Sequence, residues 1–405
     1  MRSPATPLTS QQVYSVALDF LQPHFQLQSV FKRGRVAVTV TAFYLVLFLA
    51  ASRLGSICAA CRRLVHGPDE ELLLKGLLAC LPEYREVQNR VNAAFAAMLP
   101  RSLRRAKLRL AIDLVLIPYY GKLWGGEDLY YRSQAKRGTC TFLAYATAFV
   151  IHRGQRYTLA LTVVTRKMTM RQVLEQLLNQ VSKLPGRLKI GLLLLDRGFY
   201  SVEAIQLLRT KGVPFLMPAV IRGKKPDHPK GPSGTRVFAE MKTSGWFEYT
   251  LTSSNGEQAK VQVCVKCRNR RGERKKHGRE ALVYVYGAGY RPNSYDEVRQ
   301  TYRQRFGIET SYRQLHQCRV RTSTKHFELR VFLVGLALLL RNVWVWLHDC
   351  VLSSVRRGRG GKTLRLHRLR LREMLDGLGH YAESVFGRKN AIYTERPIPQ
   401  CFEAS

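Results

Sequence analysis

The run LKIGLLLLD at residues 188–196 places the tightest constraint on how this chain can fold. It is almost continuously apolar until its final aspartate, and it stands between amphipathic helical segments at 170–184 and 201–212. An apolar strand between two helices is typical of the middle of a sheet that helices cover on both faces. Asp196 therefore falls at the carboxyl end of a central strand, where open α/β sheets bind their ligands.

Four more segments have the character of strands. Three precede the central run, at 108–120, 140–152 and 156–166, and one follows it at 213–221. Three meandering strands followed by alternating helix and strand give the order of an RNase H-like fold. We therefore expect an α/β protein with an RNase H-like mixed sheet and helices on both of its faces.

Changes in composition divide the chain into four parts. Residues 1–105 have helical apolar spacing and end in a basic cluster, which predicts a helical N-terminal domain that binds DNA ends. Residues 106–221 and 294–350 supply the RNase H-like domain, in which we expect the active site. Between them, 222–293 combine a Pro/Gly-rich linker with segments of period two, which predicts an inserted β-rich subdomain. Residues 351–405 form a basic C-terminal region.

The net charge of the chain indicates which kind of molecule it binds. There are 66 Lys and Arg against 28 Asp and Glu, a net charge of +38, so a polyanion is needed to neutralise the folded protein. Double-stranded DNA is the first expectation, and an acidic membrane surface is the alternative. The apolar runs at 36–51 and 331–340 are shorter than the roughly 20 residues that span a bilayer, so we interpret them as buried helices and expect no membrane.

Cysteine usage and the N-terminus bear on location. The nine cysteines are spread along the chain, and the first residues lack a signal-peptide pattern, which favours a reducing cytoplasm. Two Cys-x-x-Cys pairs, Cys58/Cys61 and Cys264/Cys267, leave a zinc site open as an alternative to free thiols.

Two aspartates occur in apolar strands, where burial of a charged carboxylate costs free energy. Asp113 interrupts the apolar strand at 108–120, and Asp196 ends the central strand. Taken singly, Asp113 could serve a salt bridge and Asp196 could cap the following turn. Their positions on two strands of one sheet make a shared site the alternative to these structural roles.

A third acid comes from the helix expected at 294–317. At 100° per residue, Tyr302, Arg305 and Glu309 fall within an arc of about 60°. The face could be solvated, with an Arg305–Glu309 ion pair of a few tenths of a kcal/mol. Two Asp and one Glu on separate elements can instead hold a pair of Mg²⁺ ions, which prefer oxygen ligands and activate the attacking and leaving oxygens at phosphorus.

These residues resemble a known family. Asp113 in a strand, LLLLDRGFYS around Asp196 and YRQRFGIETSYRQ around Glu309 are similar to the DDE transposases of bacterial insertion sequences, in the group with a β-strand insertion and a Y-x(2)-R-x(3)-E-x(6)-K signature. The resemblance covers about residues 105 to 350. It implies that Asp113, Asp196 and Glu309 are the catalytic, metal-binding triad, and that Tyr302 and Arg305 contact DNA phosphates.

The chain departs from the signature at one position, where His316 replaces the lysine. Our hypothesis is that Arg313 or a protonated His316, both on the active face of the helix, supplies the missing cation to DNA. Some members of the group hold a flipped base on an aromatic residue of the β insertion. Trp246 is the candidate for this contact, with a core position in the insertion as the alternative.

The sequence therefore predicts a transposase that binds the terminal inverted repeats of its insertion sequence and carries out DNA cleavage and strand transfer with Mg²⁺, for which Mn²⁺ substitutes. Transposon ends and target DNA are its partners, and a homodimer is expected in the synaptic complex. The expected location is the prokaryotic cytoplasm, on the nucleoid when bound to DNA. A catalytically inactive DNA-binding protein, an RNase H-like repair nuclease and a membrane-associated basic protein are the alternatives.

Overall fold

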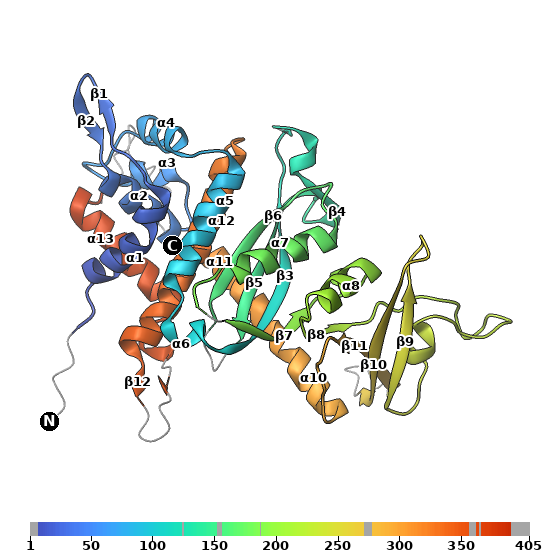
Figure 1. Ribbon diagram of the computed structural model, residues 1–405. Helices are drawn as coiled ribbons and strands as arrows, with labels where there is room; N and C mark the ends of the chain where they lie inside the picture. The colour runs from blue at the N-terminus through green and yellow to red at the C-terminus, as the bar shows by residue number, and fades with distance from the viewer. Residues whose placement is uncertain are drawn as a thin grey trace, which may run out of the picture.

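The computed structural model describes residues 7–123, 125–151, 156–186, 188–270, 278–355, 362–363 and 366–389. One long mixed sheet runs across the molecule, with a helical bundle at one end and three antiparallel strands at the other (Figure 1). The sheet strands are β3 (Lys107–Pro118), β4 (Tyr131–Lys136), β5 (Thr139–Ile151), β6 (Thr158–Val164), β7 (Lys189–Leu195), β8 (Phe215–Pro218), β9 (Gly245–Thr252), β10 (Gln258–Arg270) and β11 (Gly278–Gly287).

The helices belong to two groups. Those of the N-terminal bundle are α1 (Ser10–Phe25), α2 (Val40–Ser52), α3 (Ile57–Arg62), α4 (Glu70–Cys80), α5 (Tyr84–Met98), α6 (Arg101–Arg104) and the C-terminal α13 (Leu371–Phe386), which packs on α2 and α1. Those around the sheet are α7 (Met170–Ser182), α8 (Val202–Thr210), α9 (Arg236–Ala239), α10 (Tyr295–Arg303), α11 (Gly307–Cys318) and α12 (Phe327–Leu347).

Five strands form the centre of the sheet in the order β6-β5-β3-β7-β8. The pairs β6–β5 and β5–β3 are antiparallel, whereas β3–β7 and β7–β8 are parallel. The predicted meander followed by helix-linked strands is therefore confirmed. The three strands of the insertion continue the same sheet, because β11 pairs with β8 and is followed by β10 and β9.

Alternate side chains of the central strands pack on opposite faces, and helices cover both. Leu193 and Leu195 belong to the large core that includes α7 and α8. Leu192 and Leu194 belong to a second core with α10 and the first turn of α11. The central strand is apolar throughout because neither of its faces meets water.

The two apolar runs are buried helices. In α12 and the π-helical turn that continues it to Leu352, the length and composition suffice to cross a membrane, but 94% of the most apolar stretch is buried inside the protein. The helix expected at 36–51 begins at Val40, because residues 35–38 form strand β2. With β1 (Val30–Lys32), this strand makes a hairpin that the helical prediction for the N-terminal region missed.

Side-chain amides close the edge of the sheet at β6. The Asn92 side chain, from α5, accepts a hydrogen bond from the Leu161 backbone N–H at 2.7 Å and donates to the Leu161 carbonyl at 2.9 Å. Asn342, from α12, exchanges the same pair of bonds with the backbone of Thr158, at 2.9 and 2.8 Å. Both asparagines are buried, and their amides take the place of a neighbouring strand.

Candidate active site

Strand register places Asp113 beside Asp196. The parallel strands β3 and β7 pair with Ile112 opposite Leu195, so an aspartate occupies the next position on each. Neighbouring strands are about 4.8 Å apart. The two predicted acids therefore lie together at one edge of the sheet.

Glu309 reaches the same edge on an interrupted helix. The continuous helix predicted at 294–317 is in fact α10 and α11, joined by a 3₁₀ turn at Gln304–Phe306. One turn after Glu309, the Tyr312 hydroxyl donates a hydrogen bond to the backbone carbonyl of Asp113 at 2.7 Å. The same hydroxyl lies 2.9 Å from the hydroxyl of Thr147 on β5. These bonds fix the start of α11 against the sheet and so set the position of Glu309.

The three carboxylates converge on the guanidinium of Arg305. Its Nη1 lies 2.7 Å from Oδ2 of Asp113, and its Nη2 lies 3.4 Å from Oδ1 of Asp196 and 3.4 Å from Oε1 of Glu309. The Arg305 and Asp113 side chains are 7% and 15% exposed, whereas the other two carboxylates are 43% exposed. We call these three acids the carboxylate cluster. One side of it is deep in the protein and the other faces solvent.

Burial dominates the electrostatics of the cluster. It raises the pKa of Asp113 from 3.8 to about 6, against the opposing effect of Arg305. Burial also works against the charge of Arg305, but Tyr302, Asp113 and Asp196 together raise the Arg305 pKa above its ordinary value. Arg305 therefore remains a cation and neutralises part of the negative charge.

The cluster suits a divalent cation in its chemistry. Among the described residues, no group of three or more His, Cys, Asp or Glu side chains is arranged to hold a metal ion as it stands. The cluster nevertheless offers carboxylate oxygens only, the ligands that Mg²⁺ prefers, and all three acids already contact one positive group. The donor set therefore suits such an ion chemically, and in this structure the guanidinium of Arg305 contacts the same oxygens.

The Cys-x-x-Cys pairs give no support for zinc. Cys58 and Cys61 belong to α3 of the N-terminal bundle, whereas Cys264 and Cys267 belong to β10 of the insertion. All four are free thiols. The zinc alternative thus lacks a ligand group within the part of the chain that the structure describes.

Tyr302 lies beside the cluster, inside the protein. Its ring packs 5.3 Å from that of Tyr284 and 5.6 Å from the Arg305 guanidinium, between centres. Burial raises the pKa of the Tyr302 phenol, so the hydroxyl stays protonated. In this arrangement Tyr302 and Arg305 are turned toward the sheet and the carboxylates, and their contacts with DNA phosphates remain predictions.

The remaining predicted residues lie farther out. Arg313 and His316 are exposed on α11. Although His316 is exposed overall, partial burial of its ring and two neighbouring arginines lower its pKa, which disfavours the protonated form. The roles of Arg313 and His316 toward DNA stay predictions. Trp246 is on β9, four strands from β7 in the sheet order. Its ring stacks on that of Tyr295, with 4.7 Å between the ring centroids, and 37% of its surface is exposed. Its contact with a flipped base stays a prediction.

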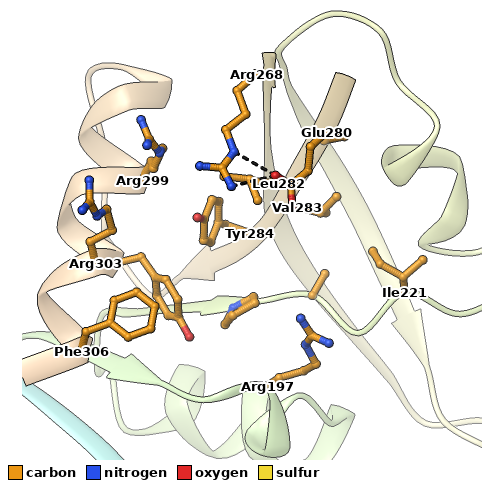
Figure 2. Close-up of a pocket in the computed structure, with 14 residues that line it drawn as sticks. Arg197, Ile221, Arg268, Glu280, Leu282, Val283, Tyr284, Arg299, Arg303 and Phe306 are labelled. Atoms are coloured by element: carbon orange, nitrogen blue, oxygen red, sulfur yellow. Dashed lines mark hydrogen bonds and ion pairs between the residues drawn. The ribbon is translucent and has the colours of Figure 1, made fainter. Parts of the chain in front are cut away.

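A basic cavity adjoins the cluster, and sequence reasoning missed it. A pocket of about 500 Å³ opens between α10 and the face of β11, as Figure 2 shows. Tyr284 and Leu282 are among the residues that line it, and Tyr302 both lines this pocket and contacts Arg305. We call it the arginine pocket after four of its lining residues: Arg197, Arg268, Arg299 and Arg303.

The only available sequence signal for this pocket was the i,i+4 spacing of Arg299 and Arg303 on α10. Arg197 follows Asp196 directly, so the pocket begins where the cluster ends. The only acid among the lining residues, Glu280, is paired with Arg268 at 2.7 Å. The other three guanidinium groups give the cavity a net positive charge.

Three carboxylates from β3, from the end of β7 and from α11, beside a basic pocket, are suited to a metal-dependent enzyme that acts on phosphodiesters. The family model described as "Transposase DDE domain" matches residues 105–343, more than half of the chain, so the protein belongs to this family. A search of curated protein sequences found no significant match. Among solved structures, the chain is similar to a piggyBac transposase in a synaptic complex with hairpin DNA, with a TM-score of 0.55 and 10% identity over 95% of this chain and 82% of that chain. The likeness confirms the predicted RNase H-like fold.

Proposed function

We propose that this transposase binds the terminal inverted repeats of its own insertion sequence, cleaves the DNA at their ends and joins the freed 3′ ends to target DNA. Asp113, Asp196 and Glu309 are the proposed catalytic carboxylates. The observation that carries the proposal is the convergence of these three acids on one guanidinium, directly beside the arginine pocket.

Mg²⁺ is the proposed cofactor, with Mn²⁺ as a substitute, and the carboxylate cluster would hold it. When bound, the ion supplies Lewis-acid activation of the attacking hydroxyl and of the leaving oxygen at phosphorus. Because Arg305 contacts all three acids, its side chain must give up part of these contacts when the cluster takes up a divalent ion. A guanidinium released in this way would be available to a DNA phosphate, which is the contact proposed for Arg305.

The arginine pocket and the open side of the cluster are the proposed place of the DNA end. Arg299 and Arg303 come from the same helix face, and Arg197 adjoins Asp196, so their charges surround the path of a strand that reaches the cluster. A homodimer that holds two transposon ends is proposed for the synaptic complex, in the cytoplasm and on the nucleoid.

The test is incubation with the DNA that flanks the gene of this protein. Wild-type protein with Mg²⁺ should nick that DNA at the element boundaries, and Asp196→Asn should not. Asp227→Asn, which changes an exposed acid in the linker, is the matched control and should cleave like wild type.

The alternatives give different results in the same assay. An inactive DNA-binding protein would shift the DNA without nicking it in either form. A repair nuclease would cut this DNA without preference for the element boundary, or would leave it intact. Either outcome would reject the proposed transposition chemistry.

A further inference from the structure

The β1–β2 hairpin is a short ribbon with a fixed base and a free tip. Phe31 pairs with Val36 and Lys32 pairs with Arg35 across the two strands. The turn between them is Arg33–Gly34, and both residues have positive φ, 51° and 74°, as a type I′ turn requires. In Figure 1 the ribbon projects from the N-terminal bundle beyond α2 and α4.

The base of the ribbon is locked into the bundle. Val38 is 1% exposed, and the next residue, Thr39, caps α2 through its side chain. On the other strand, Val30 packs so closely on Gly76 of α4 that a Cβ added at Gly76 would lie 2.3 Å from a Val30 methyl carbon. The direction in which the tip points is therefore set by packing and not by the turn.

The tip carries unopposed positive charge. Lys32, Arg33 and Arg35 are all exposed, and no Asp or Glu occurs between Asp19 and Asp69. The acids of α4, the helix beneath the ribbon, are already engaged: Asp69 caps the helix, Glu70 pairs with Arg62 and Glu71 pairs with Lys75. Asparagine is the residue that favours the first position of a type I′ turn, so an arginine there points to a role for its side chain.

The tip also exposes apolar surface. Phe31 is 63% exposed and its cross-strand neighbour Val36 is 53% exposed, which makes them two of the more exposed large apolar residues of the described chain. Cross-strand partners share one side of a ribbon, so these two form a small apolar face, while Lys32 and Arg35 form the next pair. A ligand for this tip must therefore offer both negative charge and apolar contact.

We propose that this hairpin is a duplex-DNA contact that enters the major groove, with its three cations on the flanking phosphates and Phe31 on the base edges. The inference rests on the proposed function. A two-stranded ribbon fits the major groove, where thymine methyl groups offer apolar contact between two rows of phosphates. The hairpin lies outside residues 105–343, so the match to the catalytic domain does not include this site. An anionic membrane surface is the competing partner for a basic and apolar tip.

The test compares two triple variants of the full chain. One replaces Lys32, Arg33 and Arg35 by Ala. The other replaces Lys183, Lys189 and Lys211 by Ala, three exposed cations at the end of β7 opposite to Asp196. Equal thermal unfolding midpoints would establish that both fold. Binding to the DNA that flanks the gene is measured by fluorescence anisotropy over a range of salt, and cleavage is measured on the same DNA.

The hairpin variant should lose about tenfold in affinity at physiological salt, and the slope of log K against log salt should fall by about 2 to 3, because about 0.9 is lost per phosphate contact. The control variant should change both quantities far less. Phe31→Ala should weaken binding without changing the salt slope, because it removes an apolar contact only.

Equal affinities and slopes for the two triple variants would overturn the hairpin proposal while leaving the proposed function intact if the wild type still cleaves. Binding without cleavage, with loss confined to the hairpin variant, would support the hairpin and reject the catalytic proposal. A wild type that binds no DNA would reject both. In a third arm, co-sedimentation with phosphatidylserine/phosphatidylcholine vesicles that depends on the hairpin, with unchanged DNA binding, would assign the tip to a membrane instead.

Discussion

The carboxylate cluster and the arginine pocket are neighbours that satisfy their charge in opposite ways. Both are built from the carboxyl end of β7 and from the α10 region, and both include Tyr302 or its contacts. The cluster neutralises three acids with its own Arg305. The pocket has four arginines and pairs one of them, Arg268, with Glu280. Under the proposed function the cluster would exchange its internal cation for a metal ion, whereas the unpaired arginines of the pocket would bind a DNA phosphate directly.

The largest effect is expected from removing one acid of the cluster. Glu309→Gln should lower DNA cleavage by about 1000-fold, because several kcal/mol of transition-state stabilisation depend on the complete set of oxygen ligands. DNA affinity should stay within about threefold of wild type, since the pocket is unchanged. Single-turnover cleavage and anisotropy measure the two quantities, and a similar loss in both would contradict the separation of roles.

Replacing Arg305 tests how far this cation stabilises the carboxylate cluster. Arg305→Gln leaves three acids without their shared partner and should lower the free energy of unfolding of the metal-free protein by about 3 kcal/mol. Addition of Mg²⁺ should recover more stability in Arg305→Gln than in wild type, because no guanidinium competes for the acids. Urea unfolding with EDTA and with Mg²⁺ measures this. Arg305→Lys keeps one positive charge, so its free energy of unfolding should lie between those of wild type and Arg305→Gln.

The pH dependence of the metal-free cluster follows from Asp113. Folding raises its pKa from 3.8 to about 6, so the folded protein holds this proton more tightly than the unfolded chain. The resulting stabilisation is complete below about pH 4 and is lost as the pH rises through about 6. Asp113→Asn, which resembles the neutral acid, should be more stable than wild type at pH 8, by at most about 3 kcal/mol. Chemical unfolding at several pH values should show a stability difference between Asp113→Asn and wild type that shrinks toward pH 4. A difference that does not vary with pH would contradict its origin in the raised pKa of Asp113.

The smallest effect is expected in the pocket, where the charges act additively. The double change of Arg299 and Arg303 to Ala should weaken DNA binding about tenfold at physiological salt and lower the salt slope by about 2. Cleavage at saturating DNA should change little. Lys183→Ala with Lys211→Ala removes the same charge elsewhere and serves as the control. If that pair weakened binding equally, overall charge and not the pocket would hold the DNA.

The sequence predicted the cluster better than the pocket for a physical reason. Asp113 and Asp196 stand in apolar strands whose order in the sheet follows from the helix-strand pattern, so their meeting could be inferred. The 3₁₀ turn before Glu309, and the inward direction of Arg305, depend on packing that periodicity does not encode. The pocket arginines come from three places, namely α10, β10 and the turn after β7. Arg197 and Arg268 line one cavity only because β11 pairs with both β8 and β10.

The amide-closed edge at β6 has a consequence for dissecting this protein. Asn92 belongs to the N-terminal bundle, and its side chain completes the backbone hydrogen bonding of a catalytic strand. A fragment that starts near residue 105 would leave the Leu161 N–H and C=O groups without hydrogen-bond partners on the edge strand β6. Such an unpaired edge promotes aggregation with other chains. The boundary suggested by homology is thus a poor place to cut, and expression trials should retain α5.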